Sequence, residues 1–135
     1  MTKRQSRGFK VIRSCLEEEA HKWKHIAVAE EVMTYILSLD VRVAVKVIRS
    51  ITLLDDLGTQ LPDDYVHFIG NIRGIRLWEL RTRFQNFYER ILFVRHRGRF
   101  YLLLSAFRKT TDKVPREEIE RAIRILREYD SDNEV

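Results

Sequence analysis

The sequence predicts an α+β domain with an N-terminal strand and a helical hairpin, then a three-stranded antiparallel meander, then a C-terminal helix. Three observations predict this class. Segments with helical periodicity and segments with strand alternation are grouped along the chain, which is typical of α+β folds. The 135 residues are enough for one domain with its own core. A hydrophobic content of 44% excludes general disorder.

The chain divides into three predicted parts. Residues 1–20 are expected to form a basic arm with a short helix near residues 14–20. Residues 21–129 form the domain, which begins with a strand at residues 23–28, and residues 130–135 form an acidic tail. The arm is predicted because its first part has no acid and carries five cations: Lys3, Arg4, Arg7, Lys10 and Arg13.

Two closely joined helices are predicted next, and together they form a hairpin. The first covers residues 29–39, where apolar side chains recur at helical spacing. The second covers residues 41–57, with Asp40 as its N-cap and Gly58 at its end. Alternating valines at the start of the second segment also fit a strand, but its length and the final glycine favour a helix.

Residues 58–74 are expected to form a loop. Three strands follow at residues 75–82, 87–95 and 99–107, and a Gly-containing turn joins the last two. Pro115 is expected to open the final helix, because proline suits the first helical position. The helices are expected to cover one face of the sheet and to leave the other partly open.

Side chains in the first of these three strands are expected to alternate between the two faces of the sheet. One face would carry Leu77, Glu79 and Arg81, and the other Trp78, Leu80 and Thr82.

Composition excludes several classes of protein. A single cysteine, Cys15, excludes an internal disulfide and a cysteine-based zinc cluster, and it fits a reducing compartment. No apolar run is long enough to span a membrane, and no apolar segment follows the basic N-terminus as in a secretory signal. The phosphate-binding glycine loop, the nucleophile elbow and the zinc-binding His-Glu-x-x-His motif are absent from the sequence. We therefore expect a cytoplasmic protein with no cofactor and no metal.

Positive charge is concentrated in one segment. Residues 69–113 carry eleven Lys and Arg against three Asp and Glu, whereas the rest of the chain has more acids than bases. Most of these cations are arginines, which suit bidentate contacts with phosphate. The segment therefore predicts a polyanionic partner such as a nucleic acid, although a solvated basic surface is the alternative.

Arginine and lysine can promote cleavage of RNA without a metal. When the 2′-hydroxyl of the RNA attacks the neighbouring phosphorus, the substrate supplies the nucleophile. The protein then has to position the phosphodiester and to stabilise the charge that develops on it. A site of this kind has almost no sequence motif, so residue types alone indicate it only weakly.

Four short motifs follow one another in the second half of the chain. They are Leu-Trp-Glu-Leu-Arg at residues 77–81, Tyr-Glu-Arg-Ile-Leu-Phe at 88–93, Leu-Leu-Ser-Ala-Phe-Arg-Lys-Thr at 103–110, and a Pro-led Glu-Ile-Glu-Arg-Ala segment at 115–122. In order and spacing this series resembles the phage-derived branch of the RelE/HigB toxins of toxin–antitoxin systems. Glu89 departs from the pattern, which has an aromatic residue directly before the sheet arginine.

The resemblance implies a RelE/ParE-like α+β fold and ribosome-dependent cleavage of mRNA. It also implies a cognate antitoxin with a helix-turn-helix domain, and the ribosome and mRNA as further partners. By position, the expected catalytic residues are Arg81, Arg90 and Lys109, with Arg90 directed at the scissile phosphate. The remaining candidates for RNA binding are Arg73, Arg76, Arg83, Arg108 and Lys113.

Other interpretations stay open at this point. A toxin of the same fold could act by binding, as relatives that inhibit DNA gyrase do. A non-catalytic basic module that binds nucleic acid is a third possibility. Glu79 and Arg81, two residues apart on one strand face, could form a structural ion pair instead of a site. His67 is expected to be an ordinary surface histidine.

Overall fold

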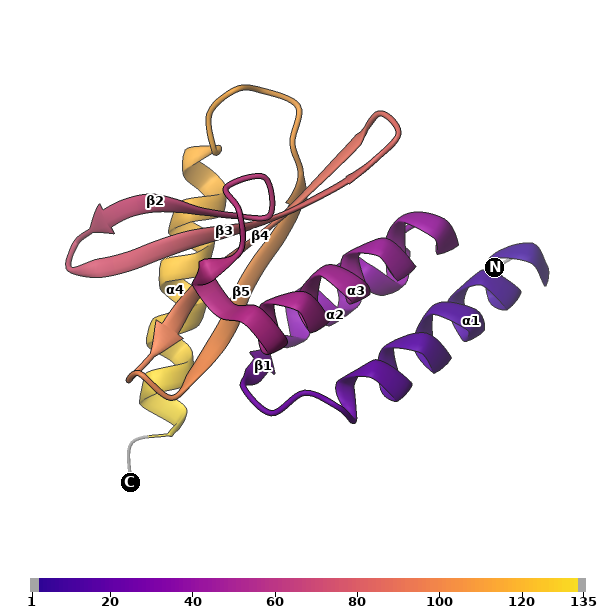
Figure 1. The fold of residues 1–135 in the computed structure, drawn as a ribbon, viewed down its shortest axis with the longest axis horizontal. Coiled ribbons are helices and arrows are strands. Elements are labelled where there is room, and N and C mark those ends of the chain that lie inside the picture. Colours follow the sequence, from indigo (N-terminus) through magenta and orange to yellow (C-terminus); the bar gives the residue numbers. More distant parts are fainter. Residues whose placement is uncertain (1–2, 134–135) are drawn as a thin grey trace.

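The fold, taken from a computed structural model, is described for residues 3–133, with side chains from residue 8 onward. Five strands and four α-helices make up the domain (Figure 1). The helices are α1 (Lys3–Ala20), α2 (Glu30–Ser38), α3 (Val41–Leu57) and α4 (Arg116–Asp132), and a 3-10 turn, η1 (Gly58–Gln60), follows α3. The strands are β1 (Ile26–Val28), β2 (Val66–Ile72), β3 (Ile75–Phe84), β4 (Phe87–His96) and β5 (Phe100–Arg108).

The strands form one sheet in the order β1-β5-β4-β3-β2. The predicted meander of three antiparallel strands is present as β3, β4 and β5, and β1 pairs with β5 in parallel. The loop expected at residues 58–74 is wrong in its second half, because β2 pairs there with β3. Gly70 and Asn71 interrupt the apolar alternation of β2, and the pairing shifts register between Phe68 and Gly70.

Helices lie on both faces of the sheet, not on one as expected (Figure 1). Leu80 of β3 packs into a core with α1, α2 and α3, whereas Leu77 packs into a second core with α4. This confirms the predicted alternation of side chains along β3. On the second face, α4 packs mainly against β5. Part of this face, over β2 and β3, is therefore left available for a site.

The N-terminal segment is a helix over Lys3–Ala20, longer than the short helix expected within a basic arm. Ile12 and Leu16 are buried in the core against α3. These residues, with Phe9, follow helical spacing among the basic residues, which dominate the composition of the segment. Residues 130–132 of the expected tail belong to α4, while residues 1–2 and 134–135 lie outside the described part.

Two contacts fix the chain around the C-terminal half of α3. The buried carboxylate of Asp55 accepts hydrogen bonds from the backbone N–H groups of Lys24 and His25, at 3.0 and 2.7 Å. Gly58 ends α3 with φ +63° and ψ −153°, and it lies against the hydroxyl of Tyr101. Together these contacts hold the segment before β1 and the turn after α3 beside the sheet.

Candidate functional site

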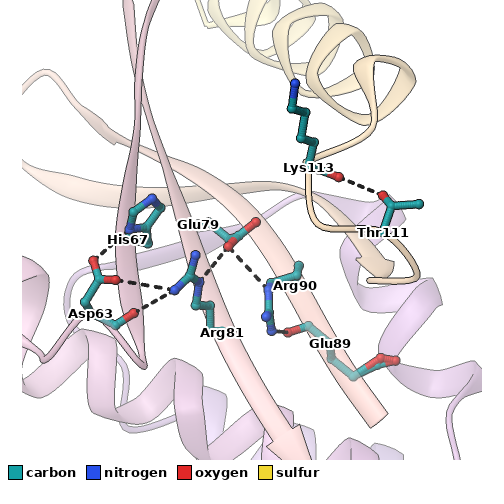
Figure 2. A network of polar contacts seen from close by, with 8 residues as sticks. All are labelled: Asp63, His67, Glu79, Arg81, Glu89, Arg90, Thr111 and Lys113. Carbon is teal, nitrogen blue, oxygen red and sulfur yellow. Dashed lines mark hydrogen bonds and ion pairs between the residues drawn. The ribbon is translucent and has the colours of Figure 1, made fainter. Parts of the chain in front are cut away.

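Two arginines are direct neighbours in the middle of the sheet. Arg81 of β3 is the pairing partner of Arg90 of β4. Glu79 precedes Arg81 by two residues, so its side chain lies on the same face. The Oε1 atom of Glu79 lies 2.7 Å from Nε of Arg81 and 3.3 Å from Nε of Arg90 (Figure 2). One buried carboxylate therefore serves two guanidinium groups, and the three side chains together carry a net positive charge.

Arg90 is the buried one of the two arginines, with 6% of the residue exposed. Its Nη1 donates a hydrogen bond to the backbone oxygen of Glu89 at 3.1 Å, while its Nε makes no hydrogen bond despite the nearby Glu79. Burial lowers the pKa of Arg90 from its ordinary value. Because arginine starts from a very high pKa, the side chain stays protonated. Arg90 therefore adds a buried positive charge next to Arg81.

Arg81 also contacts Asp63, and Asp63 in turn contacts a histidine. Its Nη1 donates to the backbone oxygen of Asp63 at 3.2 Å and lies 3.5 Å from the carboxylate of the same residue. The other carboxylate oxygen of Asp63 is 2.7 Å from Nδ1 of His67. The hydrogen bond with His67 lowers the pKa of Asp63 from its ordinary value. A continuous chain of polar contacts thus runs from His67 to Arg90, as Figure 2 shows.

A cleft of about 140 Å³ opens beside this chain on the α4 side of the sheet. Lys109 enters the cleft directly after β5, where its backbone N–H donates to the oxygen of Tyr88 at 2.8 Å. The structure therefore places Arg81 and Lys109, two of the three residues that the sequence analysis expects to be catalytic, at one cavity. The polar side chains that line the cleft are His67, Glu79, Arg81, Lys109 and Asp112.

A second, larger groove of about 400 Å³ lies on the other side of Arg81. Arg83 and Arg90 line this groove together with Arg81, whereas Lys109 does not. Arg81 is thus the cation common to both cavities, and a quarter of its side chain is exposed. Arg90 was expected to approach the scissile phosphate beside Lys109, but the structure places it toward the second groove.

The other expected RNA-binding residues are dispersed. Arg73, in the β2–β3 turn, forms an ion pair with Glu120 of α4. Arg76 covers the ring of Phe68 and lines a separate groove near the start of β3. Lys113 is exposed in the segment before α4, and its side chain points away from Arg81 in Figure 2. These three cations are therefore not part of the cleft.

Arg108 and Glu89 belong to the opposite face of the sheet. Glu89 is 2% exposed and accepts hydrogen bonds from Nε of Arg108 at 2.9 Å and from the hydroxyl of Tyr35 at 2.9 Å. Burial, and then the charge of Glu89, raise the pKa of Tyr35 above its ordinary value. Glu89, which stands where the family pattern has an aromatic residue, thus binds Arg108 and Tyr35 of α2. The acid paired with Arg90 is Glu79.

His67 and Asp63 are the site residues that the sequence analysis missed. From the sequence, Asp63 was placed only within the expected loop at residues 58–74, and His67 was expected to be an ordinary surface histidine. The single signal was their spacing of four residues in a segment that leads into a strand. Since Nδ1 of His67 contacts Asp63, Nε2 is the ring nitrogen that can exchange a proton with a molecule in the cleft.

Comparison with protein families gives a match that covers most of the chain. The family described as phage-derived protein Gp49-like (DUF891) matches residues 34–127. The chain belongs to this family. Gp49-like proteins are a family of toxin-like proteins related to RelE/HigB. No curated protein matches the chain.

The Gp49-like segment contains the whole cleft, because it runs from within α2 to within α4. The helix α1 and the strand β1 lie before it. In the part of the chain that the structure describes, no three His, Cys, Asp or Glu side chains form a group that could hold a metal ion. None of the helices within that part is long and apolar enough to cross a membrane.

Proposed function

We propose that this Gp49-like protein is the toxin of a toxin–antitoxin system and cleaves mRNA on the ribosome. Membership in a toxin-like family supports the biological role. The observation that carries the activity is the cleft in which Arg81 and Lys109 meet beside His67. In cleavage of RNA by its own 2′-hydroxyl, two cations can stabilise the developing charge and a histidine can transfer the proton.

In the proposed reaction the 2′-oxygen attacks the adjacent phosphorus while the bond from phosphorus to the 5′-oxygen breaks. Arg81 and Lys109 stabilise the negative charge that grows on the non-bridging oxygens, and both stay protonated throughout. His67, oriented by Asp63, transfers a proton between the reacting oxygens and solvent. The products are a 2′,3′-cyclic phosphate and a 5′-hydroxyl end.

Arg90 acts through its neighbours in this proposal. It shares Glu79 with Arg81, so one carboxylate does not neutralise the guanidinium that faces the cleft. Removing Arg90 would leave Glu79 to Arg81 alone, and because Asp63 also lies 3.5 Å from Arg81, the remaining guanidinium would be neutralised. Arg90 is therefore a positioning residue, and Arg81 and Lys109 are the cations that contact the phosphate.

The test is cleavage of a defined mRNA by the purified protein with and without translating ribosomes. We expect ribosome-dependent cuts and fragments that end in 2′,3′-cyclic phosphate. An mRNA with a single 2′-deoxy nucleotide at the mapped cut should resist cleavage there and be cut normally elsewhere. Cleavage of the deoxy position at an unchanged rate would overturn the mechanism. Arrest of DNA replication with translation intact would indicate gyrase inhibition instead.

The proposed partners follow from the same role. An antitoxin, expected to carry a helix-turn-helix domain, would neutralise the protein in the cytoplasm, where the ribosome and mRNA are found. A small adjacent gene for such a protein should suppress growth arrest when it is expressed together with this chain. Failure of every neighbouring gene to suppress growth arrest would contradict this part of the proposal.

A further inference from the structure

Part of β3 has an open edge. β2 pairs with β3 only as far as the partners Val66 and Leu80, but β3 continues to Phe84. Residues 81–84 therefore have β4 on one side and, within the described chain, no strand on the other. Such an edge can accept a further strand through its backbone groups.

Two backbone hydrogen bonds establish which groups face this edge. The N–H of Arg81 donates to the oxygen of Tyr65 at 2.7 Å, so the backbone of Arg81 points away from β4. The oxygen of Tyr88 accepts from Lys109 on the β5 side, so Tyr88 does not bond its pairing partner Arg83. Backbone direction alternates along a strand. The N–H and C=O of Arg83 therefore point outward at the open edge.

The groove of about 400 Å³ runs along this edge, where side chains of α3 and β3 line it together. Lys46 of α3 contributes a positive charge from one side, and Arg81 and Arg83 contribute from β3. Arg83 is exposed, and its guanidinium covers the ring of Tyr88 at 5.3 Å. Asp64 is the acid among the lining residues, so cations outnumber acids.

We propose that this edge binds an extended, acidic segment of a partner protein, which adds a short strand beside residues 82–84, next to the point where Tyr65 bonds Arg81. A peptide matches the edge because its backbone both donates and accepts, as the outward N–H and C=O of Arg83 require. Phosphate groups of RNA only accept hydrogen bonds, so they would leave the carbonyl oxygens unused. Acidic side chains on the added strand would lie beside Arg81 and Arg83, where opposite charges stabilise cross-strand pairs.

The inference rests on the proposed function for the identity of the partner, which is the antitoxin. An added strand would end beside Arg81, the residue that lines both the groove and the cleft. Acidic side chains would engage Arg81 and exclude RNA from the cleft next to Lys109. Neutralisation would then follow from occupation of a strand edge adjacent to the catalytic residues.

The test uses the full chain and a ten-residue peptide of alternating Glu and Val, with a Lys and Val peptide as the matched control. We expect the acidic peptide to bind, with an affinity that falls as salt rises, and the basic peptide not to bind. Hydrogen exchange of single amides locates the contact. The Arg83 amide should exchange rapidly in the free chain and slowly in the complex, while the Thr82 amide, which faces β4, is protected in both.

Two variants separate the contribution of the Arg83 backbone N–H to peptide binding from the contribution of the side-chain charge. Arg83→Pro removes the outward N–H, and the fold tolerates proline at an edge position of this kind. It should weaken peptide binding about tenfold or more, whereas Arg83→Ala, which keeps the N–H, should weaken it less than about fivefold. Retained protection of the Thr82 amide shows that each variant is folded.

Three outcomes would overturn the inference: no binding of the acidic peptide, binding without protection of Arg83, or equal binding by the wild-type chain and Arg83→Pro. Displacement of the peptide by a single-stranded RNA decamer that itself protects Arg83 would assign the groove to RNA and also overturn it. The mRNA cleavage assay is independent of these measurements. Protection of Arg83 together with absent cleavage would retain the docking edge and reject the endonuclease.

Discussion

Arg81 and Arg90 lie directly opposite each other on β3 and β4, and both approach the same buried oxygen of Glu79. Two like charges at neighbouring positions repel, so the carboxylate is required to hold them together. The carboxylate contacts the two arginines unequally. Its Oε1 atom lies 2.7 Å from Nε of Arg81, which is partly exposed, and 3.3 Å from Nε of Arg90, which is buried. The pair therefore consists of one accessible cation and one that supports it.

Replacement of Glu79 tests this arrangement. Glu79→Gln keeps the shape of the side chain but leaves Arg90 without its carboxylate and Arg81 with only that of Asp63, 3.5 Å away. Breaking a buried ion pair costs about 3–5 kcal/mol, and we expect the lower end because solvent reaches Arg81. The free energy of unfolding in urea measures the loss. Glu18→Gln, at an exposed position of α1, is the control and should leave stability unchanged. Equal stability of the two variants would contradict the central role of Glu79.

Removal of either accessible cation should stop catalysis and leave the fold intact. Arg81→Ala and Lys109→Ala are each expected to lower the rate of mRNA cleavage by about 10²–10³, the usual effect of losing one preorganised group that stabilises developing charge. Arg81→Lys should restore little activity, because an ammonium group cannot bond Glu79 and a phosphate with the planar fork of arginine. Lys113→Ala is the control, and its rate should match the wild type. A wild-type rate in Lys109→Ala would remove that residue from the site.

The contact between His67 and Asp63 predicts a shifted titration. The pKa of Asp63 lies below its ordinary value because of the hydrogen bond with His67. A lowered pKa stabilises the fold at pH values above the ordinary one, and this contribution is lost as the pH falls through the lowered pKa. In His67→Gln the pKa of Asp63 should rise toward its ordinary value. Titration of the Asp63 carboxyl carbon by NMR measures both values, and identical titrations in the two proteins would contradict the contact.

Asp55 should be a strong determinant of stability although it lies far from the cleft. Asp55→Ala leaves the N–H groups of Lys24 and His25 without their acceptor. An unsatisfied buried donor costs about 1–3 kcal/mol, so the melting temperature should fall by several degrees. Asp56→Ala, one residue further on and exposed, is the matched control. A similar melting temperature for both variants would show that the two backbone contacts contribute little.

Gly58 has two separate constraints that a double variant can distinguish. A Cβ atom at this position would lie 2.5 Å from the hydroxyl oxygen of Tyr101, and φ of +63° with ψ of −153° is a region that only glycine readily adopts. Gly58→Ala should therefore destabilise the fold. Adding Tyr101→Phe removes the contact but not the backbone strain, which is about 1–3 kcal/mol. Calorimetry should show partial recovery in the double variant, and full recovery would exclude the strain.

Much of the fold could be predicted from periodicity alone. The hairpin of α2 and α3 and the strands β3 to β5 carry clear patterns, and the short turn at Gln85 and Asn86 makes Arg81 and Arg90 partners. β2 was missed because Gly70 and a register shift interrupt its pattern. α1 was underestimated because its few apolar residues lie among many charges.

The candidate site was harder to predict because its contacts join distant segments. Pairing of Arg81 with Glu79 is local and was considered from the sequence. Approach of Asp63 to Arg81 depends on how the chain enters β2, and binding of Glu89 by Tyr35 joins residues 54 positions apart. Neither contact leaves a local pattern. Assignment of individual arginines therefore required the geometry of the sheet.

Arg81 lines both the cleft and the groove along β3, and under the proposed function this limits how the protein could evolve. Under the proposed function, a substitution at Arg81 that weakened binding of an inhibitor would also remove a group needed for catalysis. Variants that escape inhibition but remain toxic would have to arise at positions that line the groove alone, such as Lys46 and Arg83. If the chain is such a toxin, the shared side chain would thereby protect a host cell from the most direct mutational route to an uninhibited toxin.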